Sequence, residues 1–284
     1  MKKISLFLAT TAIIIGMMSC DKLKAPYIIE PIVEDSDTIP LTPDDINNFD
    51  GRLVVLLEDY TGVKCNNCPA AAEIANQLQE QNEGHLIVLG VHPKTPLQNP
   101  AGGFPDFRTD DGHEWNTEFN ISTYPSGLVN RTGGVLDASR WTTAVNNLIG
   151  QDAPIRLIVK TEYGHNGQEL KVSVHTKFLE TVYSGDVRLT VCMMEDSIVG
   201  KQMTPDGVVD DYMHRHVFRG TANGQTWGSI LDINADYMEE GREFVSNMRF
   251  ILSDEYNADQ FYIVAFISDN TTNNILMATE TKIK

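Results

Sequence analysis

Cys65-Asn66-Asn67-Cys68-Pro69 decides the fold of this chain, because of the segments on either side of it. The apolar run Leu53-Val54-Val55-Leu56-Leu57 before it is typical of a buried strand, and residues 70–78 after it are rich in helix-forming side chains. A C-x-x-C pair between a strand and a helix is expected to place the first sulfur at a helix N-terminus, where the helix dipole favours the reactive thiolate. The spacing also lets the two sulfurs close a disulfide. The pattern predicts dithiol exchange, with Cys65 as the nucleophile and Cys68 as the resolving thiol.

Two other interpretations of the cysteine pair stay open. One is half of a zinc site, which needs a second pair of Cys or His at matching spacing, and the chain has only four cysteines. The other is a purely structural disulfide. Lys64 favours exchange, because its positive charge beside Cys65 should lower the pKa of that thiol. We expect no metal and no other cofactor, and we expect Cys192, in a strand-like run, to be a buried core thiol.

The N-terminal residues predict export and lipid attachment. Lys2-Lys3 and the apolar residues 4–18 have the order of a signal peptide, and the apolar run is shorter than the about 20 residues of a membrane-spanning helix. Met17-Met18-Ser19-Cys20 resembles a bacterial lipobox, in which a peptidase cuts before a cysteine that carries diacylglycerol. We therefore expect residues 1–19 to be a lipoprotein signal peptide and Cys20 to be acylated, palmitate included. An ordinary signal peptide with an incidental cysteine is the alternative.

The charge of the chain limits its partners. Its 39 Asp and Glu outnumber 22 Lys and Arg, which gives a net charge of −17. So acidic a chain argues against nucleic acid and anionic lipid headgroups as partners. The expected partners are protein thiols or disulfides, or another envelope protein, with the membrane reached only through the lipid anchor. An exported protein is also located in an oxidising compartment, where disulfides form and can be exchanged.

The remaining sequence divides into three regions. Residues 20–46 are acidic and interrupted by prolines, which predicts a lipidated tether. Residues 47–150 alternate strand and helix signals, which predicts an α/β domain. After the cysteine helix its expected elements are a strand at 86–91, a helix at 110–119, a strand at 128–130, a hairpin turn at Arg131-Thr132-Gly133-Gly134 and a helix at 141–149.

After Pro154 the apolar residues alternate with a period of two, and turn-rich segments separate the runs. This pattern predicts an all-β domain over residues 151–284, most simply an immunoglobulin-like sandwich. The expected strands lie at 155–160, 170–175, 187–192, 248–252 and 261–266.

The order of elements up to Ser122-Thr123-Tyr124-Pro125-Ser126-Gly127-Leu128-Val129 resembles the thioredoxin fold, in which a cis-proline opens the third core strand and faces the dithiol. More narrowly, residues 58–62, 107–112 and 124–131 are similar to the outer membrane protein 28-related lipoproteins of Bacteroidetes. In that family a thioredoxin-like domain precedes a β-rich domain. The resemblance implies an outer membrane lipoprotein in the bacterial cell envelope, facing the periplasm or the surface.

The thioredoxin resemblance also assigns roles to further residues. Pro125 would be the substrate-docking element, held in cis with its ring near the sulfurs, and Tyr124 beside it would contact the substrate. Lys64 departs from the thioredoxin pattern, which commonly has Trp at this position, and we also expect it to contact the substrate. Asp59 and Glu58 stand six and seven residues before the first cysteine, where an acidic group serves proton transfer to the resolving thiol. One of the two is expected to point inward on its strand.

The sequence thus predicts a lipid-anchored, extracytoplasmic thiol–disulfide oxidoreductase. The alternative is a non-catalytic outer-membrane or surface binding lipoprotein in which Cys65–Cys68 is a structural disulfide. His214 and His216 would share a strand face, and we interpret them as a solvated or hydrogen-bonded pair rather than metal ligands, because no third ligand is evident. His92 receives no role.

Overall fold

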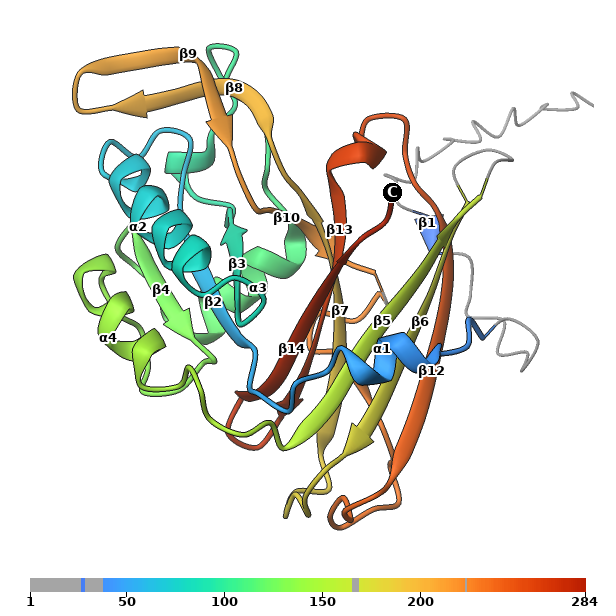
Figure 1. Cartoon of the computed structure of the whole chain (residues 1–284). Coiled ribbons are helices and arrows are strands. Elements are labelled where there is room, and N and C mark those ends of the chain that lie inside the picture. The colour runs from blue at the N-terminus through green and yellow to red at the C-terminus, as the bar shows by residue number, and fades with distance from the viewer. Residues whose placement is uncertain (1–26, 29–37, 165–168, 223) are drawn as a thin grey trace, which may run out of the picture.

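The computed structural model describes residues 27–28, 38–164, 169–222 and 224–284 (Figure 1). Its helices in these ranges are α1 (Pro43–Asn47), α2 (Cys68–Gln81), α3 (Asp110–Glu118) and α4 (Trp141–Asn146), with 3-10 turns at Pro96–Gln98, Ala138–Arg140 and Ala258–Gln260. Its strands are β1 (Tyr27–Ile28), β2 (Val55–Tyr60), β3 (Leu86–Val91), β4 (Ser126–Val129), β5 (Ile155–Tyr163), β6 (Glu169–Phe178), β7 (Val187–Glu195), β8 (Ile198–Thr204), β9 (Gly207–His214), β10 (Val217–Thr221), β11 (Ser229–Ile230), β12 (Glu243–Ile251), β13 (Phe261–Asp269) and β14 (Asn274–Lys282). Across these ranges, no helix combines the length and the apolar character that a membrane crossing requires. The predicted signal peptide and Cys20 lie outside the described residues.

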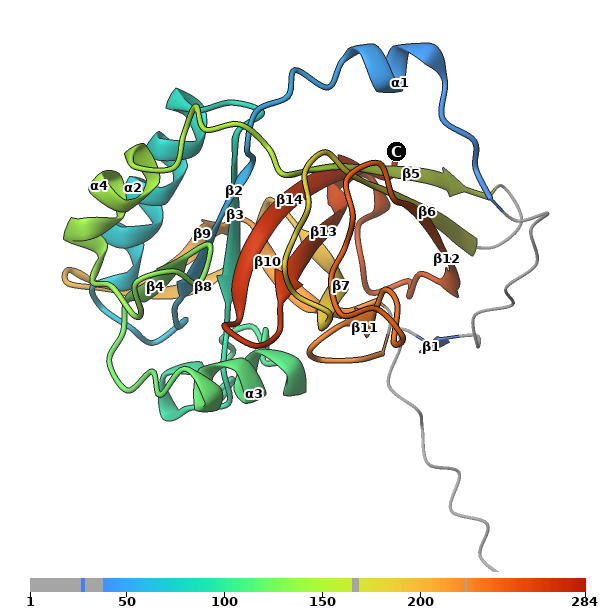
Figure 2. The ribbon, with the colours of Figure 1, turned by 90° about the horizontal axis from the view of Figure 1, so that it is seen from below.

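A thioredoxin-like sheet is built around β2, with β3 parallel to it on one side and β4 antiparallel on the other. Because side chains alternate between the faces of a strand, Leu57 packs in the cluster that contains α2 and α4, and Leu56 packs with α3. Figure 2 shows α2 and α4 on one side of this sheet and α3 on the other. Trp141 of α4 lies so close to Gly127 of β4 that a Cβ there would be 2.6 Å from the indole nitrogen. The predicted thioredoxin-like arrangement is confirmed.

The hairpin turn predicted at residues 131–134 is also present. Gly127 and Leu136 exchange two backbone hydrogen bonds of 2.8 Å across it. Gly133 and Gly134 have φ angles of 73° and 79°, which glycine adopts without steric cost.

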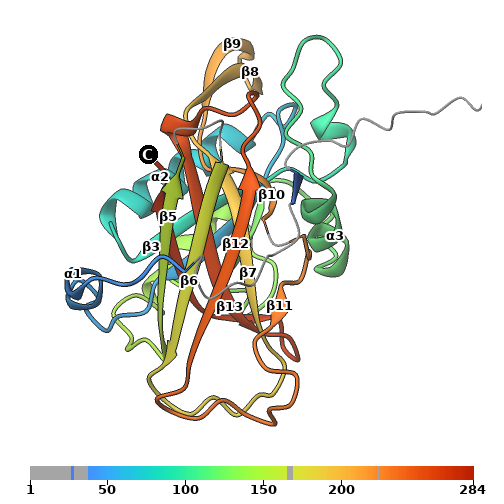
Figure 3. The ribbon, with the colours of Figure 1, turned by 90° about the vertical axis from the view of Figure 1, so that its right-hand side faces the viewer.

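The residues after Pro154 form antiparallel sheets, as the period-two alternation predicts. β1, β12, β6 and β5 make one sheet, and β7, β13 and β14 belong to a second. The sheets lie face to face (Figure 3) and enclose a shared apolar core that includes Val159, Val172, Leu189 and Ile263. The described residues of this part contain no α-helix, which agrees with the sequence prediction.

The second sheet continues the thioredoxin-like sheet through β10. Val217 of β10 pairs in parallel with Gly90 of β3, and β10 pairs with β7 on its other side. The Gly90 N–H donates to the His216 carbonyl at 2.7 Å, and a Cβ on residue 90 would lie 3.2 Å from the same oxygen. The two parts of the chain are therefore joined by backbone pairing, which the sequence did not predict.

A hairpin of β8 and β9 projects from the β-rich part and lies over the cysteine loop beside α2 (Figure 1). The Met203 N–H donates to the Val63 carbonyl at 2.8 Å. The Gln202 side-chain amide donates to the carbonyls of Gly62 at 3.1 Å and Cys65 at 3.2 Å. Apart from the strand face expected for His214 and His216, the sequence patterns predicted no strands in this segment, yet it reaches the predicted active loop.

Residues 38–47, most of which the sequence assigns to the tether, contact the β5–β6 pair. The Ile39 N–H donates to the Ser173 hydroxyl at 2.9 Å, and the His175 ring bonds to the Ile39 carbonyl at 2.8 Å. Lys160 forms an ion pair with Asp45 at 2.8 Å. This segment therefore belongs to the folded body.

Candidate functional site

Cys65 and Cys68 form a disulfide, with an S–S distance of 2.12 Å and a Cα–Cα distance of 5.4 Å. The predicted pairing is confirmed, and the predicted helix begins within the cysteine motif. α2 starts at Cys68, and Cys65 lies in the preceding loop, where its N–H donates to the Gly62 carbonyl at 3.0 Å. The reason is Pro69, which fits only the first turn of a helix and so places the helix start at the second cysteine.

Both sulfurs are buried in the disulfide form. Cys65 is 5% exposed and Cys68 is 2% exposed. The β8–β9 hairpin accounts for part of this cover, because Gln202 and Met203 bond to the backbone of the cysteine loop. We therefore expect the hairpin to limit the access of a partner to Cys65.

Lys64 is turned toward the segment between β3 and α3. Its ammonium donates to the Ala101 carbonyl at 2.9 Å and lies 4.9 Å from the centre of the Phe104 ring. The charge remains one residue from Cys65, and its effect on the pKa of that thiol stays a prediction.

Glu58 and Asp59 point to opposite faces of β2, and the structure separates their roles. Glu58 is fully buried and forms a bidentate pair with Arg131, with N–O distances of 2.7 Å and 2.8 Å. The Arg131 guanidinium lies 4.7 Å from the Trp115 ring centre and 5.1 Å from that of Phe119. The Glu58 carboxylate is therefore held by this cation, on the face away from Asp59.

Asp59 is the acidic residue on the cysteine side of the sheet. It lines a cleft together with Cys68 and Pro69 and is 4% exposed. One of its carboxyl oxygens, Oδ1, is buried without a hydrogen-bond partner among the described residues. Burial raises the pKa of Asp59 from 3.8 to about 7, so the group can exchange a proton near neutral pH.

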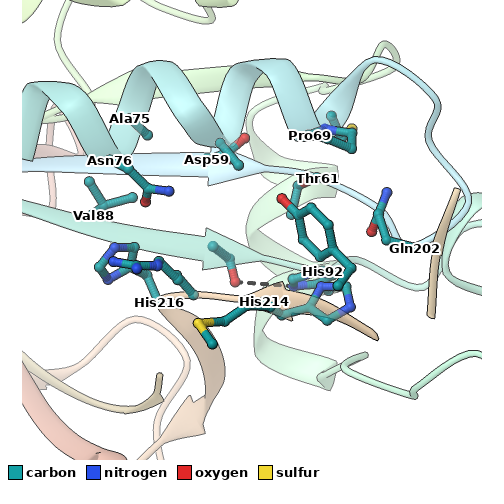
Figure 4. Close-up of a pocket in the computed structure, with 16 residues that line it drawn as sticks. Asp59, Thr61, Pro69, Ala75, Asn76, Val88, His92, Gln202, His214 and His216 are labelled. Carbon is teal, nitrogen blue, oxygen red and sulfur yellow. Dashed lines mark hydrogen bonds between the residues drawn. The ribbon is translucent and has the colours of Figure 1, made fainter. Parts of the chain in front are cut away.

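Three histidines line the same cleft opposite Asp59 (Figure 4). His92 follows β3, His214 ends β9, and His216 lies in the turn before β10. They are 4%, 5% and 8% exposed. Burial lowers the pKa of His92 to about 3 and the pKa values of His214 and His216 to about 4, so all three are neutral at pH 7.

Of the two alternatives for His214 and His216, a solvated pair is wrong, whereas hydrogen bonds of His214 with the backbone of Gly200 and Lys201 agree with the hydrogen-bonded one. Both rings are buried, and the Nε2 atom of each lacks a hydrogen-bond partner in the described part of the chain. Within that part, no group of three or more His, Cys, Asp or Glu side chains is arranged to hold a metal ion. The sequence carried no signal for the cleft, because its residues come from five separate segments and meet only when β10 pairs with β3.

The Tyr124–Pro125 peptide bond is cis, as predicted. β4 begins at the next residue, Ser126, which pairs with Tyr60 at the end of β2 that leads into the cysteine loop. The Tyr124 hydroxyl donates to Asn116 of α3 at 2.6 Å. Tyr124 and Pro125 therefore stand at the same end of the sheet as the cysteine loop, and their contact with a substrate stays a prediction.

Comparison with known proteins identifies the family. The model of the family described as outer membrane protein Omp28 matches residues 113–284, more than half of the sequence. The chain belongs to the Omp28 family. Family membership places it in the cell envelope as an outer membrane protein. The matched residues do not include Cys65 and Cys68, so the match carries no information on the dithiol. No curated protein matches the sequence.

Two solved structures support the fold. HBP35 of Porphyromonas gingivalis is 18% identical with a TM-score of 0.62, and the alignment covers 82% of this chain and 76% of HBP35. Protein AGR_C_4864 of Agrobacterium tumefaciens is 12% identical with a TM-score of 0.51, and the alignment covers 82% of this chain and 96% of that protein. A domain of the outer membrane lipoprotein Omp28 of P. gingivalis is 23% identical over 46% of this chain and 89% of that domain, with a TM-score of 0.33.

Proposed function

We propose that this Omp28-family lipoprotein is a thiol–disulfide oxidoreductase that works through Cys65 and Cys68. The observation that carries the proposal is Asp59. A buried carboxyl with one unpaired oxygen and a raised pKa lies in the same cleft as the second cysteine. A purely structural disulfide does not require a proton acceptor beside it. A buried carboxyl without a hydrogen-bond partner also destabilises the folded state, so its presence beside Cys68 favours a role in proton transfer.

The proposed reaction follows from the roles assigned to Cys65, Cys68 and Asp59. In the dithiol form, the Cys65 thiolate attacks a substrate disulfide, forms a mixed disulfide and releases the first substrate thiolate. The Asp59 carboxylate then takes the proton from the Cys68 thiol, and the new thiolate attacks the sulfur of Cys65. The Cys65–Cys68 disulfide forms, the second substrate thiolate leaves, and the substrate has gained the two electrons that the dithiol lost. In the opposite direction each step and the proton transfer are reversed.

We assign substrate docking to Tyr124, Pro125 and Lys64. The start of β4 lies at the end of the sheet where the cysteine loop leaves β2, and the sheet order places β4 last, with Gly127 already paired to Leu136 on its outer side. An extended substrate segment can therefore pair with the backbone ahead of Gly127, at Tyr124. Expected partners are protein thiols or disulfides, or another envelope protein.

We further propose that Cys20 carries the lipid anchor and that residues 151–284 are an immunoglobulin-like sandwich. The strand order supports the second point. In the immunoglobulin fold, strands A, B and E of one sheet face strands C, F and G of the other. Here β5, β6 and β12 take the places of A, B and E, and β7, β13 and β14 take those of C, F and G. The remaining boundaries are a signal peptide over residues 1–19, a tether over 20–46 and a thioredoxin-like domain over 47–150, except that residues 38–46 pack against β5 and β6 and so leave the tether to end before residue 38.

The second candidate function is a binding lipoprotein with a structural disulfide. The burial of Cys65, at 5% exposure, and the hairpin over it favour this interpretation. A redox titration of the pair against glutathione separates the two candidates. An exchanger is expected to have a potential between about −270 and −120 mV, whereas a potential below about −300 mV identifies a structural bond and refutes the oxidoreductase.

A further inference from the structure

The cleft beside Cys68 combines groups from both parts of the chain. Asp59 comes from the thioredoxin-like sheet, whereas His214 and His216 come from the β8–β9 hairpin and the turn that follows it. Three buried polar atoms in this cleft have no hydrogen-bond partner among the described residues: Oδ1 of Asp59 and Nε2 of each of these two histidines. Unpaired buried groups are rare in folded proteins, and three that line one cleft call for a common explanation.

The cleft has the size and polarity to hold ordered water. Its volume is about 40 Å³, and a buried water needs at least about 10–15 Å³ together with two to four polar partners. The exposed residues Met213 and Arg215 also line it, so the cleft leads from the buried carboxyl toward the protein surface. Figure 4 shows Asp59 on one side of the cleft and the histidines on the other.

We propose that His214 and His216 hold the water through which Asp59 exchanges the proton of the resolving thiol with solvent. The inference rests on the proposed oxidoreductase function and gives the β-rich part a role in it. After Asp59 has taken the proton from Cys68, the carboxylic acid passes it to the bound water, and the water passes a proton on to solvent. This restores the carboxylate for the next turnover. The imidazoles stay neutral throughout, so they are positioning residues that orient the water through Nε2.

The surroundings of the cleft agree with this division of roles. A neutral imidazole can either donate to or accept from water at Nε2, whereas a protonated one could only donate. The titratable and charged residues that line the cleft are Asp59 of β2, Cys68 of α2, His92 after β3, Tyr212 and His214 of β9, and Arg215 and His216 after β9. Three further charged residues interact electrostatically with these groups: Glu73 of α2, Asp196 before β8 and Arg219 of β10. His216 has a φ of 54°, so substitution there strains the backbone, and His214 is the better position for a test.

The experiment uses the reduced full chain in a Cys192→Ala background and 4,4′-dithiodipyridine as the probe. Attack by Cys65 releases one pyridinethione, and resolution by Cys68 releases a second, so one absorbance trace reports both steps. The variants are His214→Leu, which fills the space without a polar atom, and His214→Gln, whose amide can still bond to water. His92→Leu is the matched control, because His92 and His214 pack edge-on against Phe107 at similar centroid distances of 5.1 Å and 4.9 Å.

We expect His214→Leu to slow the second release at least about tenfold and to leave the first release unchanged. The pH at which the second release is half-maximal should rise, because the Asp59 carboxylate loses a solvating water. His214→Gln should restore most of the rate, and His92→Leu should slow it less than twofold. Any one of three results would overturn this inference and leave the proposed function standing. The second release could be equally fast in the wild type and His214→Leu, His214→Gln could fail to restore the rate, or His214→Leu and His92→Leu could slow it equally. A wild-type chain that releases no pyridinethione would overturn the proposed function and this inference with it.

Discussion

Replacing Asp59 with asparagine tests whether the carboxyl beside Cys68 is buried and unpaired as described. Burial raises its pKa from 3.8 to about 7, a change of about three pH units. Each unit corresponds to about 1.4 kcal/mol, so ionisation of Asp59 in the folded chain costs about 4 kcal/mol of stability. The pKa of Asp59 is higher in the folded chain than in the unfolded chain. The stability that the protonated carboxyl contributes is therefore fully present below pH 3.8 and is lost as the pH rises through 7.

The side-chain amide introduced by Asp59→Asn cannot ionise, so the variant chain does not incur this cost. We expect its free energy of unfolding to exceed the wild-type value by an amount that grows from less than about 1 kcal/mol near pH 4 to about 4 kcal/mol at pH 8. Urea unfolding of the oxidised chains, followed by tryptophan fluorescence at several pH values, measures the difference. Glu80→Gln, at an exposed position of α2, is the control and should show no such trend. A difference between Asp59→Asn and wild type that stays constant from pH 4 to 8 would refute the burial argument, and with it the role of Asp59 as proton acceptor.

Three further predictions concern the thiols and the hairpin. Cys68→Ala should trap mixed disulfides through Cys65, whereas Cys65→Ala should trap few, and equal trapping by both on non-reducing gels would contradict their assigned roles. Gln202→Ala removes the two hydrogen bonds from its side chain to the carbonyls of Gly62 and Cys65 in the cysteine loop, each worth about 0.5–1.5 kcal/mol, so N-ethylmaleimide should modify reduced Cys65 at least several-fold faster. An unchanged alkylation rate would mean that the hairpin does not control access. Cys20→Ala should leave the membrane fraction after a carbonate wash, and a variant that still sediments with membranes would contradict lipid attachment.

The sequence by itself determined the local elements of the thioredoxin-like part. The apolar run before Cys65, the helix after it and the glycines at 133–134 are short-range signals, because each depends on side chains within a few residues. The cis bond before Pro125 followed from the resemblance to the thioredoxin fold. The sequence also limited the proton acceptor to Glu58 or Asp59 but could not choose between them, because a strand reveals alternation without revealing which face meets the cysteines.

Only the tertiary structure decided how these elements form a site. It selected Asp59 by placing Arg131 against Glu58, and it joined the two parts of the chain through the pairing of Val217 with Gly90. That pairing carries the β8–β9 hairpin over Cys65 and brings histidines from distant segments to one cleft. Sheet pairing between distant residues leaves little trace in the local sequence, because backbone hydrogen bonds can form between almost any two strands of suitable length. The buried, unpaired groups of the cleft are therefore a property of the fold, set by how its two parts are joined.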